Sequence, residues 1–154
     1  MIRRATADDA ELLEEMDRQC FPGDHPYGLF RWDRGVAWIA IEGDTRHHYT
    51  EPRPQGYIAA HPMGRGRWFF SRVGVMPAAR GAGLQRRLMA VLERYGRREG
   101  WRELVTYTAG HNGYSTDNIL KSGWRTYEPR RSFVGWDVVH LRKRLRYVTG
   151  SPSR

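Results

Sequence analysis

The most informative stretch for predicting the fold is VGVMPAARGAGL, Val73–Leu84. It begins as an apolar strand, passes a proline and two closely spaced glycines, and enters a run with apolar residues at helical spacing, Leu84, Leu88, Val91, Leu92 and Tyr95. Glycine lets a backbone approach a ligand without a Cβ in the way, and a helix N-terminus presents N–H groups that have no intrahelical acceptor. The pattern predicts a strand–loop–helix unit whose loop binds an anion, most naturally a phosphate or pyrophosphate.

Two better-known phosphate motifs do not fit this loop. A P-loop needs Gly-Lys-Ser or Gly-Lys-Thr, which is absent, and the run Gly81–Arg86 lacks the third glycine of a dinucleotide fingerprint. The loop is therefore either another class of phosphate-binding turn or a purely structural tight turn that its glycines permit.

Further elements flank this unit on both sides. Thr6-Ala7-Asp8-Asp9 has the pattern of a helix N-cap followed by an acid three residues later, and Leu12, Leu13, Met16 and Cys20 have helical spacing. We expect strands at 2–4, 36–41, 55–60, 67–75, 103–108, 124–128 and 133–145, and a long helix from Leu84 to about Gly100. The expected fold is one α/β domain over residues 1–146, with a mixed, mostly antiparallel sheet, flanking helices and a frayed tail at 147–154.

Length and composition narrow the functional class. The chain has 154 residues, 40% hydrophobic and 28% charged, which is typical of one globular domain. It contains no apolar run long enough for a membrane span and no signal-peptide pattern. The single cysteine, Cys20, excludes an internal disulfide and a Cys-based zinc site. We therefore expect a cytoplasmic protein, a monomer or homodimer, with no membrane partner and no metal.

The charge balance is strongly basic. The chain has 26 Lys and Arg against 17 Asp and Glu, a net charge of +9, and only Lys121 and Lys143 are lysines. The electric field of such a charge attracts phosphorylated cofactors, nucleic acid and acidic proteins alike, so it does not identify the partner. A bias of genome composition explains the excess of arginine over lysine equally well. The run Arg142–Arg146 is either a nucleic-acid contact or a solvated edge strand.

The decisive stretch resembles the signature of the GNAT superfamily of acetyl-CoA-dependent N-acetyltransferases. Val75-Met76-Pro77, Arg80–Leu84 and Leu88 match this signature, although Ala78 replaces its usual Gln or Arg. The similarity extends to residues 2–9, 20–22, 112 and 123–124. It implies a central pair of parallel strands that splay apart, here 69–75 and 105–109.

The resemblance also implies the cofactor and its site. Acetyl-CoA would be the co-substrate. Its thioester arm would bond the backbone of Val73 and Val75, and its pyrophosphate would lie on the loop. The cofactor-binding residues implied in this way are Val73, Val75, Arg80, Gly81, Ala82, Gly83, Leu84, Gln85 and Asn112.

The catalytic groups are less well marked. Where the family often has a tyrosine that protonates the leaving thiolate, this chain has Ile119, so the proton comes from Ser115, Tyr114 or water. The strand 68–73 contains no carboxylate to serve as general base. His111 is the first substitute, because histidine titrates near neutrality, although a surface or structural histidine is the more ordinary interpretation. Further candidates for the base are His61, Asp24, His25 and Glu42.

Taken with the resemblance, these residues predict transfer of an acetyl group to a primary amine. The acceptor is open: a small molecule, a protein N-terminus or lysine, or the amino group of an aminoacyl-tRNA. The aromatic loop Phe21–Trp32 is the candidate acceptor site, and His47-His48 is better explained as a solvated turn than as a metal site. The alternative is a non-catalytic module that binds CoA or, through its basic surface, nucleic acid.

Overall fold

The computed structural model describes residues 1–23, 34–43, 51–110, 113–131 and 137–145, apart from the side chain of Tyr114. It contains two compact units, which we describe separately. The first unit comprises Met1–His61 and Phe70–Leu92, and the second comprises Pro62–Phe69 and Glu93–Arg154. The prediction of a single domain over 1–146 stays a prediction, and the predicted tail 147–154 lies outside the described residues.

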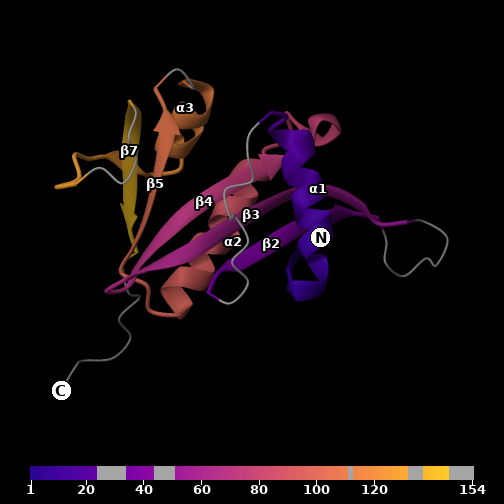
Figure 1. Ribbon diagram of the computed structural model, residues 1–154, viewed down its shortest axis with the longest axis horizontal. Helices are drawn as coiled ribbons and strands as arrows, with labels where there is room; N and C mark the ends of the chain where they lie inside the picture. Colours follow the sequence, from indigo (N-terminus) through magenta and orange to yellow (C-terminus); the bar gives the residue numbers. More distant parts are fainter. Residues whose placement is uncertain (24–33, 44–50, 111–112, 132–136, 146–154) are drawn as a thin grey trace. The chain divides into compact units, whose positions relative to one another are not determined.

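The first unit is a sheet with a helix on each face. Its strands are β1 (Ile2–Arg4), β2 (Val36–Glu42), most of β3 (Arg53–Gly64) and the end of β4 (Arg67–Val75), and antiparallel pairs join β1 to β2 and β2 to β3. Figure 1 shows α1 (Ala10–Cys20) crossing these strands. On the opposite face, Gly56 of β3 lies against Leu84 and Leu88 of α2 (Leu84–Arg98).

The sequence of this unit explains its packing. Successive residues of a strand point to opposite faces, and β2 is buried from Val36 to Ile41, as expected of a strand covered on both sides. One face forms a core with α1, whose members are Ala5, Leu13, Met16, Cys20, Ala37, Ile39, Ile41, Tyr57 and Ala59. The predicted cap is also confirmed: a short 3₁₀ turn, Ala7–Asp9, precedes α1, and the Thr6 N–H donates to Asp9 Oδ2 at 2.8 Å.

The second unit continues the sheet from the β3–β4 hairpin. β4 pairs in parallel with β5 (Glu103–Ala109), from Arg67 opposite Glu103 to Phe69 opposite Val105, whereas β4 itself continues to Val75. β5 and β6 (Arg125–Thr126) each pair antiparallel with β7 (Val138–Arg144). In the described residues the strand order is β1-β2-β3-β4-β5-β7-β6. This mixed, mostly antiparallel sheet confirms the predicted fold class.

Aromatic and buried polar groups hold the second unit together. Trp101 stacks on Trp68, with ring centroids 3.9 Å apart. The α2 helix ends in the Schellman pattern, with the Trp101 N–H donating to Gly96 O at 2.8 Å and Gly100 at φ +77°. Buried Glu93 accepts from Lys143 Nζ at 2.7 Å and from Trp124 Nε1 at 3.2 Å.

Some elements differ from the expectation. The helix α3 (Gly113–Lys121) was not predicted as an element, because nine residues with few apolar positions give a weak periodic signal. The predicted strand 124–128 is only β6, since Pro129 has no N–H to extend the ladder beyond Tyr127. Of the predicted strand 133–145, residues 138–144 form β7, and 133–136 lie outside the described residues.

Candidate functional site

The loop between β4 and α2 has the backbone that its glycines predict. A short 3₁₀ turn, Pro77–Ala79, leads into Gly81 at φ +86° and Gly83 at φ +72°, both in the left-handed region that favours glycine. The Arg80 Nε donates to Val75 O at 3.3 Å, which ties the loop to the end of β4. The loop therefore has a conformation that other residues would adopt only with strain.

The start of α2 completes a surface suited to a diphosphate. The helix begins at Leu84, and the Arg87 N–H donates to Gly83 O at 3.2 Å, so the positive end of the helix dipole lies next to the loop. A Cβ placed on Gly81 or Gly83 meets no atom within 4 Å, which shows that the space in front of the loop is open. Leu84 is buried and anchors the helix, whereas the loop residues before it are exposed. The N-terminus of the helix, the positive end of its dipole and the open space in front of the loop fit the pyrophosphate of CoA.

The other predicted cofactor residues of the first unit adjoin this loop in the chain. Val73 and Val75 are half-buried on β4, and the next residue, Met76, donates its N–H to Gln55 O of β3 at 2.8 Å. Gln85 lies in the first turn of α2. The backbone of β4 is thus held by its neighbour up to the point where the loop begins.

A buried polar cluster of the first unit was missed by the sequence analysis. Asp17 of α1 is 2% exposed, and its Oδ1 lies 2.8 Å from Arg72 Nε of β4. The Tyr57 hydroxyl of β3 donates to the same carboxylate, and burial together with this hydrogen bond raises the pKa of Tyr57 far above its ordinary value. The Arg72 guanidinium also lies over the Phe21 ring, 4.1 Å from its centroid. The cluster joins α1, β3 and β4, and it holds the first residue of the predicted acceptor loop.

One signal in the sequence could have identified Asp17. Leu13, Met16 and Cys20 mark the apolar face of α1, and Asp17 falls on that face, four residues after Leu13. A carboxylate at a core position needs a charged or hydrogen-bonding partner. The strand before the loop has no carboxylate of its own between Trp68 and Val73, and Asp17 of α1 supplies one to Arg72 of that strand.

The predicted catalytic residues belong to the second unit. Ser115 is half-buried in α3, whereas His111, Asn112 and the side chain of Tyr114 lie outside the described residues. Ile119 is 2% exposed and forms part of the core. Because the cofactor loop belongs to the first unit, the structure does not by itself bring Ser115 and the loop into one site.

Of the remaining candidates for the base, His61 and Glu42 lie in the described residues. His61 is half-buried on β3, and Glu42 at the end of β2 accepts a hydrogen bond from Gln55 Nε2 at 3.3 Å. Asp24, His25 and His47-His48 lie outside the described residues. Within the described ranges, no group of three His, Cys, Asp or Glu side chains could hold a metal ion. No helix in those ranges is long and apolar enough to cross a membrane.

Comparison with known structures shows the fold. The ribosomal-protein-S18-alanine N-acetyltransferase of Escherichia coli has a TM-score of 0.76 and 11% identity, with all of both chains covered. A GNAT-family acetyltransferase of Desulfovibrio desulfuricans has a TM-score of 0.72 and 19% identity over 95% of this chain and 99% of that one. A Bacillus subtilis acetyltransferase in complex with CoA has a TM-score of 0.71 and 14% identity over 94% and 99%.

Sequence comparison shows the family. No curated protein matches this chain. The model of the acetyltransferase (GNAT) family, however, matches residues 9–124, a segment that begins before α1 and includes the β4–α2 loop. The match covers most of the chain, and this chain belongs to the GNAT family of acetyltransferases.

Proposed function

We propose that the protein transfers an acetyl group from acetyl-CoA to the nitrogen of a primary amine. The observation that carries the proposal is the loop from Arg80 to Gly83, whose two left-handed glycines face open space at the N-terminus of α2. In a member of this family, a loop of that geometry supports CoA binding rather than a purely structural turn.

Backbone groups of the first unit would hold the cofactor. The pyrophosphate would accept hydrogen bonds from N–H groups between Gly81 and Gln85, and the pantetheine arm would pair with the backbone of Val73 and Val75. Ala82 and Leu84 contribute only backbone groups. Arg80 already donates to Val75 O, so its main role here is to fix the loop. Asn112 stays a proposed contact from the sequence.

When bound, acetyl-CoA supplies an acetyl group activated as a thioester. The amine nitrogen must be neutral to form the new C–N bond, and the C–S bond then breaks to release a thiolate that takes up a proton. His111 is the proposed base for the amine. Ser115 and Tyr114 are the proposed donors to the thiolate, with water as the alternative. Ile119 is buried and has no ionisable group, so it cannot take part.

The Asp17–Arg72 pair supports this chemistry by position. Arg72 directly precedes Val73, and its guanidinium is held by Asp17 on one side and lies over Phe21 on the other. Fixing Arg72 fixes the register of the strand that would bind the pantetheine arm. We assign the pair a positioning role, because the carboxylate is already engaged by both Arg72 and Tyr57.

The acceptor class is the open part of the proposal. A protein N-terminal amine is one candidate, and the E. coli structure above is named as an alanine N-acetyltransferase of a ribosomal protein. Lysine side chains, small amines and aminoacyl-tRNA are the others. The single cysteine, Cys20, is buried and unpaired in the described residues, which fits a reducing compartment such as the cytoplasm.

An acceptor screen tests the function directly. Purified protein is mixed with acetyl-CoA and, separately, small amines, peptides with free N-termini or lysines, and aminoacyl-tRNA, and release of free thiol is followed against a mixture without acceptor. We expect one class to accelerate thiol release. Binding of CoA without acceptor-dependent release in any class would favour the non-catalytic CoA-binding alternative and contradict the proposal.

A further inference from the structure

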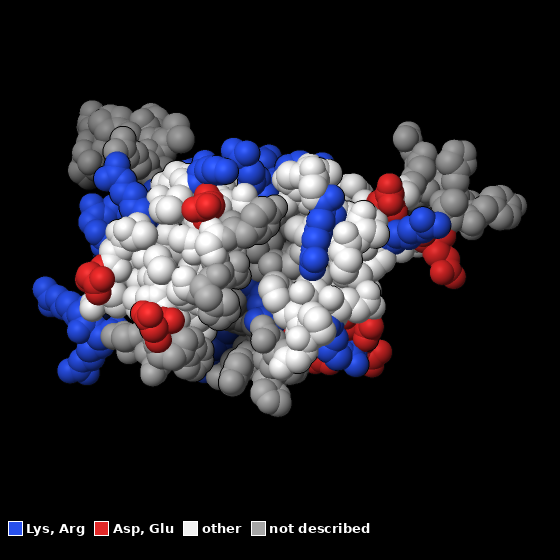
Figure 2. Space-filling view, turned by 90° about the horizontal axis from the view of Figure 1, so that it is seen from above, with Lys and Arg blue, Asp and Glu red and all other residues white. Residues whose placement is uncertain are grey.

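The second unit concentrates arginines on its last strands and neighbouring turns. Lys and Arg cover more of the surface visible in Figure 2 than Asp and Glu do. In the second unit, six arginines line adjoining depressions of the surface. We call this set the β7 arginine face, and its members are Arg102, Arg125, Arg130, Arg131, Arg142 and Arg144. None of these residues takes part in the proposed acetyl transfer.

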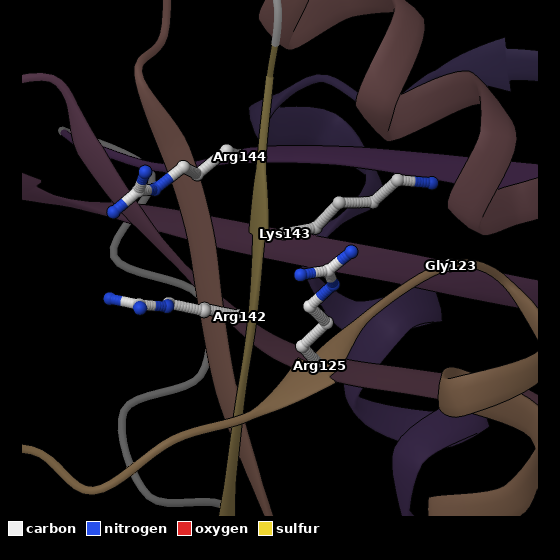
Figure 3. A pocket seen from close by; sticks show the side chains of 5 residues that line it. All are labelled: Gly123, Arg125, Arg142, Lys143 and Arg144. Atoms are coloured by element: carbon white, nitrogen blue, oxygen red, sulfur yellow. The ribbon is translucent and has the colours of Figure 1, made fainter.

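Three depressions in this face share Arg142. The smallest, of about 380 Å³, is lined by Gly123, Arg125, Arg142, Lys143 and Arg144. Figure 3 shows Arg142 and Arg144 pointing to one side of β7 and Lys143 to the other, as the alternation of a strand requires. The largest of the three, of about 790 Å³, is also lined by Arg65 and Arg67. Its described lining contains two glutamates, Glu103 and Glu128.

Most arginines of this face form no ion pair with a carboxylate in the part of the chain that the structure describes. Arg125 lies directly opposite Arg142 in the β6–β7 ladder, and like charges at such positions destabilise a sheet. Glu103 is already paired with Arg67 at 2.8 Å, and Lys143 is paired with Glu93. Among the described residues, no carboxylate forms an ion pair with Arg102, Arg125, Arg130, Arg131 or Arg144. A bound polyanion would remove this repulsion.

The lining favours contact with phosphates rather than with bases. Tyr127 is the single aromatic residue among the described lining residues, and the Arg142 guanidinium covers its ring at 5.0 Å from the centroid. A surface that bound single strands would expose aromatic rings for stacking. Arginine forks, in contrast, match the oxygens of phosphate groups.

We propose that the β7 arginine face binds the phosphate backbone of double-stranded RNA. Its cations stand on strands and short turns rather than on a projecting helix of the kind that enters the major groove of DNA. Such a surface fits the wide, shallow minor groove of an A-form duplex and the phosphates that border it. The proposal does not depend on acetyl transfer, because the face lies in the second unit and the cofactor loop in the first.

The test measures RNA affinity as a function of salt. The probe is an RNA duplex of about 16 base pairs, compared with a DNA duplex of the same sequence and with polyglutamate as competitor. The variant is Arg125→Gln/Arg144→Gln, two exposed arginines, and the control is Arg18→Gln/Arg94→Gln, which removes the same charge from helices α1 and α2. Circular dichroism and CoA affinity report folding in both.

We expect the wild type to bind the RNA duplex more tightly than DNA, with affinity falling steeply as salt rises. The slope of log affinity against log salt should decrease by about 2 in the double variant, roughly one per lost phosphate contact, and stay unchanged in the control. Three results would overturn the proposal: no RNA binding at low salt, equal binding of DNA or equal competition by polyglutamate, or equal slopes in variant and control. Failure of the acceptor screen would leave these outcomes unaffected.

Discussion

Asp17 and Arg72 lie 55 positions apart in the chain and form a salt bridge in which the two side chains are 3% and 17% exposed. The pair connects α1 to the strand that leads into the cofactor loop, and the Tyr57 hydroxyl donates to the same carboxylate. A buried ion pair of this kind contributes little to the free energy of unfolding as a whole. Removal of one member lowers that free energy strongly, because the other member is left as a buried charge without a partner.

Asp17→Ala should therefore lower the free energy of unfolding by about 3 to 5 kcal/mol. Urea denaturation measures the change. The control is Glu15→Ala, which breaks an exposed pair between Glu15 and Arg18 on the same helix and should cost less than about 1 kcal/mol. Equal effects of the two substitutions would show that burial of the Asp17 pair contributes nothing.

Asp9 should make stability depend on acid pH. Its hydrogen bonds with Arg3, opposed by burial, lower its pKa from 3.8 to about 2. A group whose pKa is lower in the folded state stabilises the protein above its unfolded pKa, and this contribution disappears as pH falls through the folded pKa. The difference in unfolding free energy between the wild type and Asp9→Asn should thus be constant above about pH 4 and shrink towards about pH 2. Thermal unfolding of both proteins at each pH measures this difference. A difference independent of pH would contradict the assignment.

Gly83→Asp should abolish CoA binding in a folded protein. The substitution puts a side chain and a negative charge into the open space before the loop and strains a residue at φ +72°. Gly64→Asp is the matched control, because Gly64 also has a positive φ, +90°, and open space around it, but lies in the β3–β4 hairpin. Calorimetric titration with CoA measures both, and wild-type affinity in folded Gly83→Asp would refute the site.

Ser115→Ala and Tyr114→Phe distinguish a hydroxyl donor from water. If either hydroxyl protonates the thiolate, its removal should lower kcat by about 10² to 10⁴ with little change in CoA affinity. Thr116→Val is the control, since the Thr116 hydroxyl is already hydrogen-bonded to Thr108 at 2.6 Å and its loss should affect stability more than turnover. Near wild-type turnover in both single variants and in the double variant would leave water as the donor.

Gly74→Ala should destabilise the first unit. A Cβ at this position would overlap the Tyr57 ring and come within 3.0 Å of Cys20 Sγ, so α1 or β3 would have to shift. Overpacking of this kind costs about 1 to 3 kcal/mol. Gly113→Ala, where a Cβ meets nothing within 4 Å, should leave stability nearly unchanged. Urea denaturation of the two variants compares them, and a stable Gly74→Ala protein would mean that the sheet accommodates the methyl group.

The sequence by itself determined the local features of this protein. The glycines at 81 and 83 dictate a turn that only residues tolerant of positive φ can form, and the helical spacing from Leu84 onward dictates the helix behind it. The bounds of β4 and the capping of the short turn before α1 follow equally from neighbouring residues, since each depends on interactions within a few positions. The family was identified from this same stretch, and the cofactor that we propose was predicted from it.

Contacts between residues that are far apart in the sequence depend on the tertiary fold. No local rule connects Asp17 to Arg72 or sets Arg125 opposite Arg142, because those contacts arise from strand order and register after the chain has folded. The short helix α3 was also beyond the sequence pattern, and the strand predicted at 124–128 is only the two-residue β6, since elements of this length are stabilised by packing on their neighbours more than by their own periodicity. The carboxylate that pairs with Arg72 of β4 therefore comes from α1, because side chains that meet in space need not be close in sequence.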